Sequence, residues 1–148
     1  MNPLLLGALV GAFVSGGFIA LQAPTNALLA RGVGSAVNAA FVSFLVGSLA
    51  LLAVALALGA RPTAGAMRAL PWYAWTGGLY GAVFVTMAAW AAPRLGVTMF
   101  LAAAIAGQLA LALFLDRMGA FGLARADIGP MRLLGVVLVL AGVVLVRR

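Results

Sequence analysis

Long apolar runs that lack a charged residue constrain the fold of this chain more than any other feature of its sequence. A helix rises about 1.5 Å per residue, so roughly 20 apolar residues cross the hydrocarbon core of a bilayer. Apolar residues make up 66% of the 148 residues and charged residues only 7%. A domain of this size cannot hide so much apolar surface from water, so we expect an all-α integral membrane protein. The four runs are Met1–Ala30, Gly32–Ala60, Ala69–Pro93 and Leu95–Leu115.

A fifth apolar segment lies between Arg132 and Arg147 and is shorter. Its roughly 14 uncharged residues become about 19 if the helix begins at Ile128 and Arg132 snorkels to the interface. A re-entrant or interfacial segment is the alternative. We expect a single transmembrane domain over residues 1–148 with five transmembrane helices, at about 3–30, 33–60, 70–92, 95–116 and 129–147.

The residue types that are missing exclude several classes of function. The chain has no His and no Cys, and its only acids are Asp116 and Asp127. Metal centres, Cys or His nucleophiles and paired-carboxylate catalysis therefore lack their residues, and we expect no enzyme, no metal and no cofactor. The net charge of +7 comes from arginines scattered between the apolar runs. That pattern indicates contact with a lipid bilayer and no nucleic acid.

The distribution of the arginines gives almost no signal for the orientation in which the chain inserts into the membrane. Orientation normally follows an excess of Lys and Arg on the cytoplasmic side. With five spans, one side receives five arginines and the other four, which favours dual topology, in which copies insert both ways and pair antiparallel. Single insertion with a weak signal is the alternative. If the fifth helix did not span, Arg147 and Arg148 would change sides, and a count of seven to two would be a firm signal for an N-terminus inside. The two groups are Arg61, Arg68, Arg117, Arg125 and Arg132 on one side and Arg31, Arg94, Arg147 and Arg148 on the other.

Polar and small residues share one face of the first predicted helix, within a sector of about 100°. Glycines at four-residue spacing allow helix backbones to approach closely. Pro24 removes the donor for the Ala20 carbonyl, and buried amides need polar partners or water. The amides therefore either line an aqueous crevice or bond to neighbouring helices. The face consists of Gly7, Gly11, Ser15, Gln22, Thr25 and Asn26.

The other predicted helices carry weaker candidates. Asn38 is expected to bond across to the first helix, and Tyr80 either faces a pathway or packs with its hydroxyl satisfied. Gln108 lies deep in an apolar run and needs a hydrogen-bond partner. Thr98 lies on the same side of the predicted helix as Gln108. Asp116 is either an interfacial ion-pair member or a substrate or proton site. The predicted close-packing residues are Gly7, Gly11, Ser15, Gly77, Gly81 and Gly107. No acid or base lies inside a span, which leaves energy coupling open.

Short motifs along the whole chain resemble the YdcZ-type family of bacterial membrane proteins. Each motif is weak alone, but their order and spacing are more specific. They are ALQAPTNA at residues 20–27, VSFLVG at 42–47, PWYAW at 71–75 with Gly77-Gly78, APRLG at 92–96, Gly107-Gln108, Leu115-Asp116 and LAGVVL at 140–145.

The resemblance implies a half-length member of the drug/metabolite transporter superfamily in the bacterial inner membrane. Full-length members have ten helices in two inverted halves, which a half-length chain would rebuild as an antiparallel homodimer. Family members often have His and Phe after the Asp, where this chain has Arg117 and Met118. The resemblance therefore implies no functional role for Asp116 and these two residues.

The functional hypothesis is a small secondary transporter that moves a neutral or amphipathic solute. Its substrate, of unknown identity, would pass through a crevice between two copies of the chain near the bilayer midplane. The alternative is a non-transporting membrane subunit whose polar stripes are assembly surfaces. The crevice candidates are Gln22, Asn26, Asn38, Tyr80, Thr98 and Gln108.

Overall fold

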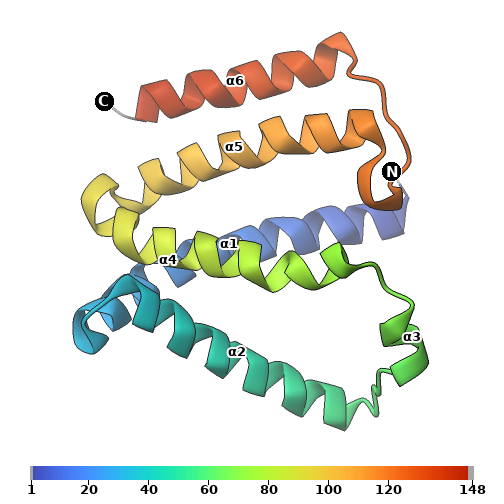
Figure 1. Ribbon diagram of the computed structural model, residues 1–148. Helices are drawn as coiled ribbons and strands as arrows, with labels where there is room; N and C mark the ends of the chain where they lie inside the picture. The colour runs from blue at the N-terminus through green and yellow to red at the C-terminus, as the bar shows by residue number, and fades with distance from the viewer. Residues whose placement is uncertain (1, 147–148) are drawn as a thin grey trace. The chain divides into compact units, whose positions relative to one another are not determined.

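The computed structural model describes residues 2–146, and every regular element in this range is a helix (Figure 1). The prediction of an all-α chain is confirmed for these residues. The chain divides into two compact units, Met1–Arg94 and Leu95–Arg148. Arg147 and Arg148, which enter the topology count, lie outside the described residues, as does the last residue of the predicted helix 129–147.

The first unit begins with two long helices that pack against each other, α1 (Pro3–Val33) and α2 (Ala36–Ala57). The Asn2 side chain accepts a hydrogen bond from the Leu4 amide at 2.9 Å and caps the start of α1. Gly34 ends α1 in the left-handed conformation, with φ at 84°, which glycine adopts without a steric penalty. Ser35 then caps α2, so that a connection of only two residues reverses the chain.

The third predicted helix, at 70–92, has a different start in the structure. The chain passes through the short helix α3 (Ala64–Arg68) and the 3₁₀ turn η1 (Trp72–Thr76) before α4 (Gly77–Leu95) begins. The Thr76 hydroxyl donates to the Tyr73 carbonyl at 2.7 Å, which fits the tighter turn. Adjacent glycines at 77 and 78 also weaken helix propagation at this point. Trp72, Tyr73 and Trp75 therefore lie on a 3₁₀ turn that precedes the α-helix.

The second unit is a pair of packed helices, α5 (Val97–Met118) and α6 (Pro130–Val146). Between them, Gly119 caps α5 in the left-handed conformation, with φ at 62°, and the short 3₁₀ turn η2 (Ala120–Gly122) follows. Two ion pairs cross this connection, Arg132 with Asp116 and Arg117 with Asp127. Asp127 lies in the loop that the sequence predicted, whereas Asp116 still belongs to the last turn of α5.

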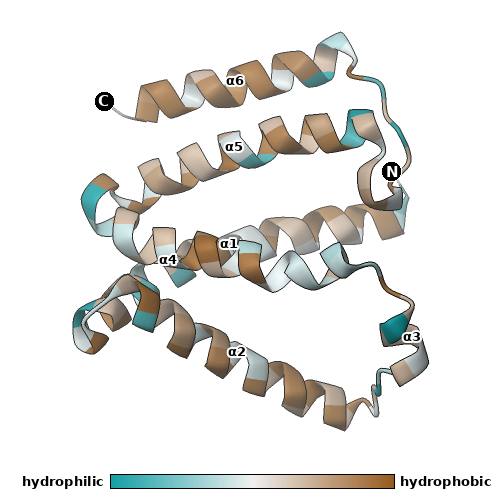
Figure 2. Cartoon of the chain, in the orientation of Figure 1, coloured by the Kyte–Doolittle hydropathy of each residue, from teal (hydrophilic) through white to brown (hydrophobic). Residues whose placement is uncertain are grey.

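Three helices are long and apolar enough to cross a membrane, namely α1, α2 and α5, while α6 has 17 residues and is shorter. Apolar residues dominate the helices, and the polar residues gather mainly at helix ends and connections (Figure 2). Large apolar side chains such as Phe13, which is 84% exposed, face outward. This exposure is expected of a protein whose surrounding solvent is lipid. The number of spans beyond these three stays a prediction.

The buried residues of α1 and α2 are confined to the ends that meet at the Gly34–Ser35 turn. In α1 the buried residues begin at Ala23, whereas residues 2–19 are all exposed. In α2 only Ala39 and Ala40 are buried. Alanine occupies most of these positions, because small side chains allow helices to pack closely within a membrane. The N-terminal half of α1 thus has no cover from the rest of the first unit.

Candidate functional site

The polar face of α1 contains hydroxyl groups that its own backbone satisfies. The Ser15 hydroxyl donates to the Gly11 carbonyl at 2.8 Å. The Thr25 hydroxyl lies 3.0 Å from the carbonyls of both Leu21 and Gln22. Such bonds let a hydroxyl lie in hydrocarbon without a partner on another helix. These two residues therefore need no neighbouring helix or solute.

The amides of the same face are not satisfied in this way. Gln22 is exposed, and its side chain makes no hydrogen bond to any residue in 2–146. Asn26 is only 3% exposed, and its Nδ2 has no hydrogen-bond partner within the same range. A buried amide donor without a partner costs about 1–3 kcal/mol. We refer to Gln22 and Asn26 as the α1 amide pair.

The small residues on the N-terminal half of this face are open. A Cβ built at Gly7 or Gly11 would meet no atom of another described element within 4 Å, and Ser15 is exposed. The close packing expected of these residues is therefore not made within the first unit. A helix face that offers such close approach and has no partner is suited to contact with another chain.

Two candidates outside α1 have local partners. Asn38 Nδ2 donates to the Val33 carbonyl at 3.1 Å, which is the bond to the first helix that the sequence predicted. Because this bond satisfies a carbonyl in the last turn of α1, Asn38 has a structural role at the α1–α2 turn. Tyr80 is 64% exposed, with its hydroxyl 3.0 Å from that of Thr76. Its ring faces outward from the described structure.

The second unit contains the remaining two crevice candidates, both on α5. Thr98 and Gln108 are exposed, and neither side chain makes a hydrogen bond within residues 2–146. Gln108 lies eight residues before Asp116, which is about 12 Å along the candidate membrane span α5. It is a third amide that needs a partner from outside the described residues.

Of the other predicted packing glycines, one lies at a close contact. A Cβ built at Gly81 would lie 3.0 Å from Cζ of Phe44 in α2, whereas Gly77 and Gly107 have open space. Glycine at position 81 thus lets α4 approach the Phe44 ring. The sequence indicated a packing patch here but could not single out the position that faces another helix.

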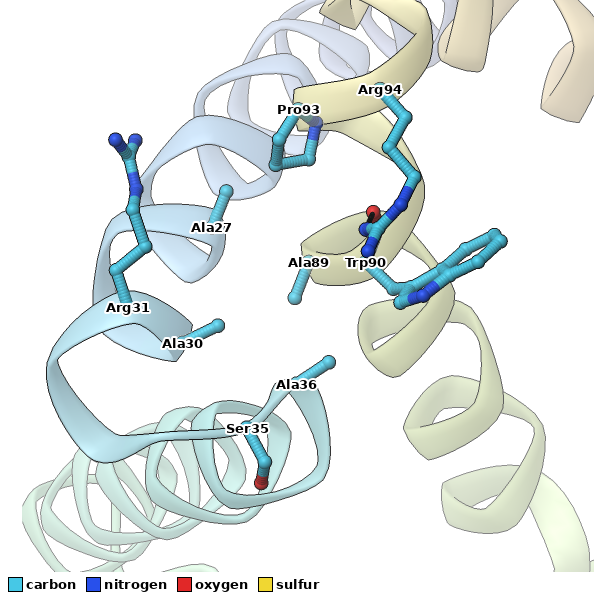
Figure 3. Close-up of a pocket in the computed structure, with 9 residues that line it drawn as sticks. All are labelled: Ala27, Ala30, Arg31, Ser35, Ala36, Ala89, Trp90, Pro93 and Arg94. Carbon is cyan, nitrogen blue, oxygen red and sulfur yellow. Dashed lines mark hydrogen bonds between the residues drawn. The ribbon is translucent and has the colours of Figure 1, made fainter.

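A cavity of about 580 Å³ opens where the C-terminal ends of α1 and α4 meet the start of α2 (Figure 3). None of the six predicted crevice residues lines it. The sequence indicated only contact with the lipid bilayer for its arginines, Arg31 and Arg94. The signal that could have indicated more is the complete lack of acids in residues 1–115, since no carboxylate of that stretch can neutralise them.

A family model described as "Putative inner membrane exporter, YdcZ" matches residues 7–145, a range that includes every candidate residue above. No curated protein and no solved structure matches the chain.

Proposed function

This chain belongs to the YdcZ family of inner membrane proteins, and from that premise we propose that it is a small secondary transporter that works as an antiparallel pair. It is a multi-pass inner membrane protein of a transporter family. In the proposal each copy crosses the bilayer five times, and a crevice between two copies conducts the solute. Inverted-repeat transporters place their sites at such an interface near the midplane.

The depth of the α1 amide pair carries the proposal. Arg31, in the last turn of α1, marks the interface. Gln22 lies nine residues earlier, or about 14 Å away along the helix, which is close to the middle of a hydrocarbon core of about 30 Å. An amide at that depth is costly unless a polar group or water meets it. Because the described residues supply no such group, the proposal places a polar crevice there.

A second copy of the chain is the proposed cover for the crevice. The open face of α1, with Gly7, Gly11 and Ser15, continues to the exposed Gln22 on the same side of the helix, and the buried Asn26 follows one turn later. Close helix approach at the glycines would seal one end, and the amides would line the wider part. The nearly balanced arginine count supports opposite insertion of the two copies.

The chemistry of the lining limits the solute. Gln22, Asn26 and Gln108 offer hydrogen-bond donors and acceptors without a fixed charge, and the surrounding side chains are apolar. A bare ion would find no counter-charge at this depth. A small neutral or amphipathic solute is therefore the proposed substrate class.

Accessibility to water tests the crevice directly, and the absence of native cysteine makes the test clean. Single-cysteine variants Q22C and N26C in membrane vesicles are treated with a membrane-impermeant maleimide, which reacts only with a hydrated thiol. We expect Q22C to react and N26C, at a position that is only 3% exposed, to react more slowly, whereas F13C, on an outward-facing apolar side chain, should not react. If neither crevice cysteine reacts from either side of the membrane, the amides lie in dry packing and the transporter proposal fails.

Leucine substitution separates transport from assembly. The Q22L/N26L variant should still cross-link as a dimer but lose efflux of a neutral fluorescent dye from proteoliposomes. The matched control is S15A/T25V, which removes two hydroxyls of the same face that already bond their own helix. Failure of Q22L/N26L to dimerise would indicate the alternative, a non-transporting subunit that uses the amides for assembly.

A further inference from the structure

The cavity at the ends of α1, α2 and α4, here called the Arg31–Arg94 cavity, has a mixed lining. Four of its nine lining residues are alanines, whose small side chains leave space between the three helix ends (Figure 3). At about 580 Å³ it falls within the size range of small-molecule sites, roughly 300–1,000 Å³. The residues that line it are Ala27, Ala30, Arg31, Ser35, Ala36, Ala89, Trp90, Pro93 and Arg94.

The charge of this cavity is positive and uncompensated. Arg31 and Arg94 form no ion pair with any residue in 2–146. The two acids of the chain belong to the second unit and pair there with Arg117 and Arg132. A counter-ion for the Arg31–Arg94 cavity therefore has to come from outside the first unit.

Arg94 is held in place but keeps most of its donors. Its Nη1 donates to the Trp90 carbonyl, and its guanidinium carbon lies 4.4 Å from the centroid of the Trp90 ring. The guanidinium group thus lies over the indole ring, and Figure 3 shows the two side chains next to each other. Since a guanidinium has five N–H donors, the remaining ones are available to an anion.

The start of α2 adds a second positive element. Ser35 caps the helix by accepting the Asn38 amide at 3.0 Å, which leaves the Ala36 amide at the cavity wall without an acceptor among the described residues. The N-terminal end of a helix carries a partial positive charge and unpaired N–H groups, both of which favour an anion. A planar guanidinium and backbone amides are the donors that typically bind phosphate.

We propose that the Arg31–Arg94 cavity binds a phosphate group at the membrane surface. The helix ends that form it lie at the level of lipid headgroups, because Arg31 and Arg94 end their apolar helices. The phosphate belongs either to an anionic phospholipid, with the alanine walls against its glycerol, or to a free phosphate ion. This site is independent of the transport proposal, because none of its lining residues belongs to the crevice.

Simple anchoring accounts for less of what is observed. Each arginine lies in the last turn of a helix, where a cation favours the helix dipole. That role explains either arginine alone, but it does not explain why two of them, a helix start and a stacked indole surround one hollow without an acid. The two explanations predict different behaviour when lipid is supplied.

Native mass spectrometry of the detergent-purified chain with phosphatidylglycerol tests the proposal. We expect one bound phosphatidylglycerol per chain, with affinity weakened roughly 30-fold in R31Q/R94Q, since each arginine near the surface contributes about a fivefold factor. The matched control R61Q/R68Q removes two arginines of the same unit that line no part of the cavity, and its affinity should be unchanged. Equal loss in the two variants would mean unspecific charge attraction and would overturn the proposal.

Two further measurements keep the test decisive if R31Q/R94Q does not insert. R31K/R94K preserves the charge but loses the planar, stacked donors, so it should bind phosphatidylglycerol more weakly than the wild type, which unspecific charge attraction would not predict. In a W72F/W75F chain, Trp90 is the only tryptophan, and its emission should change on titration with phosphatidylglycerol but not with phosphatidylcholine. Displacement by millimolar inorganic phosphate would identify a free-phosphate site, and no displacement a lipid site. No emission change with either phosphatidylglycerol or phosphate would refute the site.

Discussion

Arg132, in the first turn of α6, lies with its Nη1 3.6 Å from Oδ2 of Asp116 in the last turn of α5. The pair joins the two helices of the second unit at the end where the loop enters α6. It also gives one of the two acids of the chain a local partner, which fits the interfacial ion pair that the sequence suggested for Asp116.

We expect this ion pair to contribute little to stability. Both side chains are about half exposed, at 44% for Asp116 and 55% for Arg132, and exposed pairs contribute on the order of 0–1 kcal/mol. D116N, R132Q and the double variant should therefore have similar free energies of unfolding in detergent. A loss of dye efflux in D116N but not in R132Q would instead assign Asp116 to the transport path.

Glycine is required at position 119. Its φ of 62° is strained for other residues, and a Cβ there would lie 2.6 Å from Cγ of Arg125 and 3.1 Å from the Leu123 carbonyl oxygen. We expect G119A to lower the free energy of unfolding by about 1–3 kcal/mol. Gly129, in the same connection, has open space and serves as the control, so G129A should unfold close to the wild type. Equal stability of the two variants would contradict the conformation of the α5–α6 connection.

The contact between Gly81 and Phe44 makes a similar prediction for α4 and α2. Valine at position 81 would force the Phe44 ring to move, because the Cβ alone already lies 3.0 Å from it. Overpacking of this kind costs about 1–3 kcal/mol. G81V should therefore melt earlier than G78V, which changes a glycine with open space. The double variant G81V/F44A should lose less stability than the losses of the two single variants added together. If the losses simply add, the contact between Gly81 and Phe44 is contradicted.

Dual insertion is tested with a reporter fused to the C-terminus. With five arginines against four, we expect signal from both sides of the membrane. Under five spans, R147Q/R148Q changes the count to five against two and should place the C-terminus outside. R61Q/R68Q leaves three against four and should shift the reporter in the opposite direction. A reporter confined to one side in all three chains would exclude the antiparallel pair.

The sequence predicted the helices well where apolar length alone decides. A run such as Gly32–Ala60 specifies a long helix because every backbone group in lipid must be bonded within its own segment. It predicted less well at residues 70–76, where the Thr76 hydroxyl bonds the Tyr73 carbonyl and a 3₁₀ turn replaces the first α-helical turns. Such side-chain bonds depend on local geometry and leave no signal in hydrophobic periodicity.

The amino-acid sequence by itself determined that this is a membrane protein, which segments form its long helices and which residue types are available for its chemistry. These properties depend only on composition and on order along the chain. The tertiary structure decided which polar groups have partners. Gln22 and Asn26 share one helix face, yet one is exposed and the other buried with an unpaired donor. Likewise Arg31 and Arg94, which are 63 positions apart in the sequence, line one cavity. The physical reason is that burial and pairing depend on what neighbouring helices bring to a side chain, and helix packing fixes that after the helices have formed.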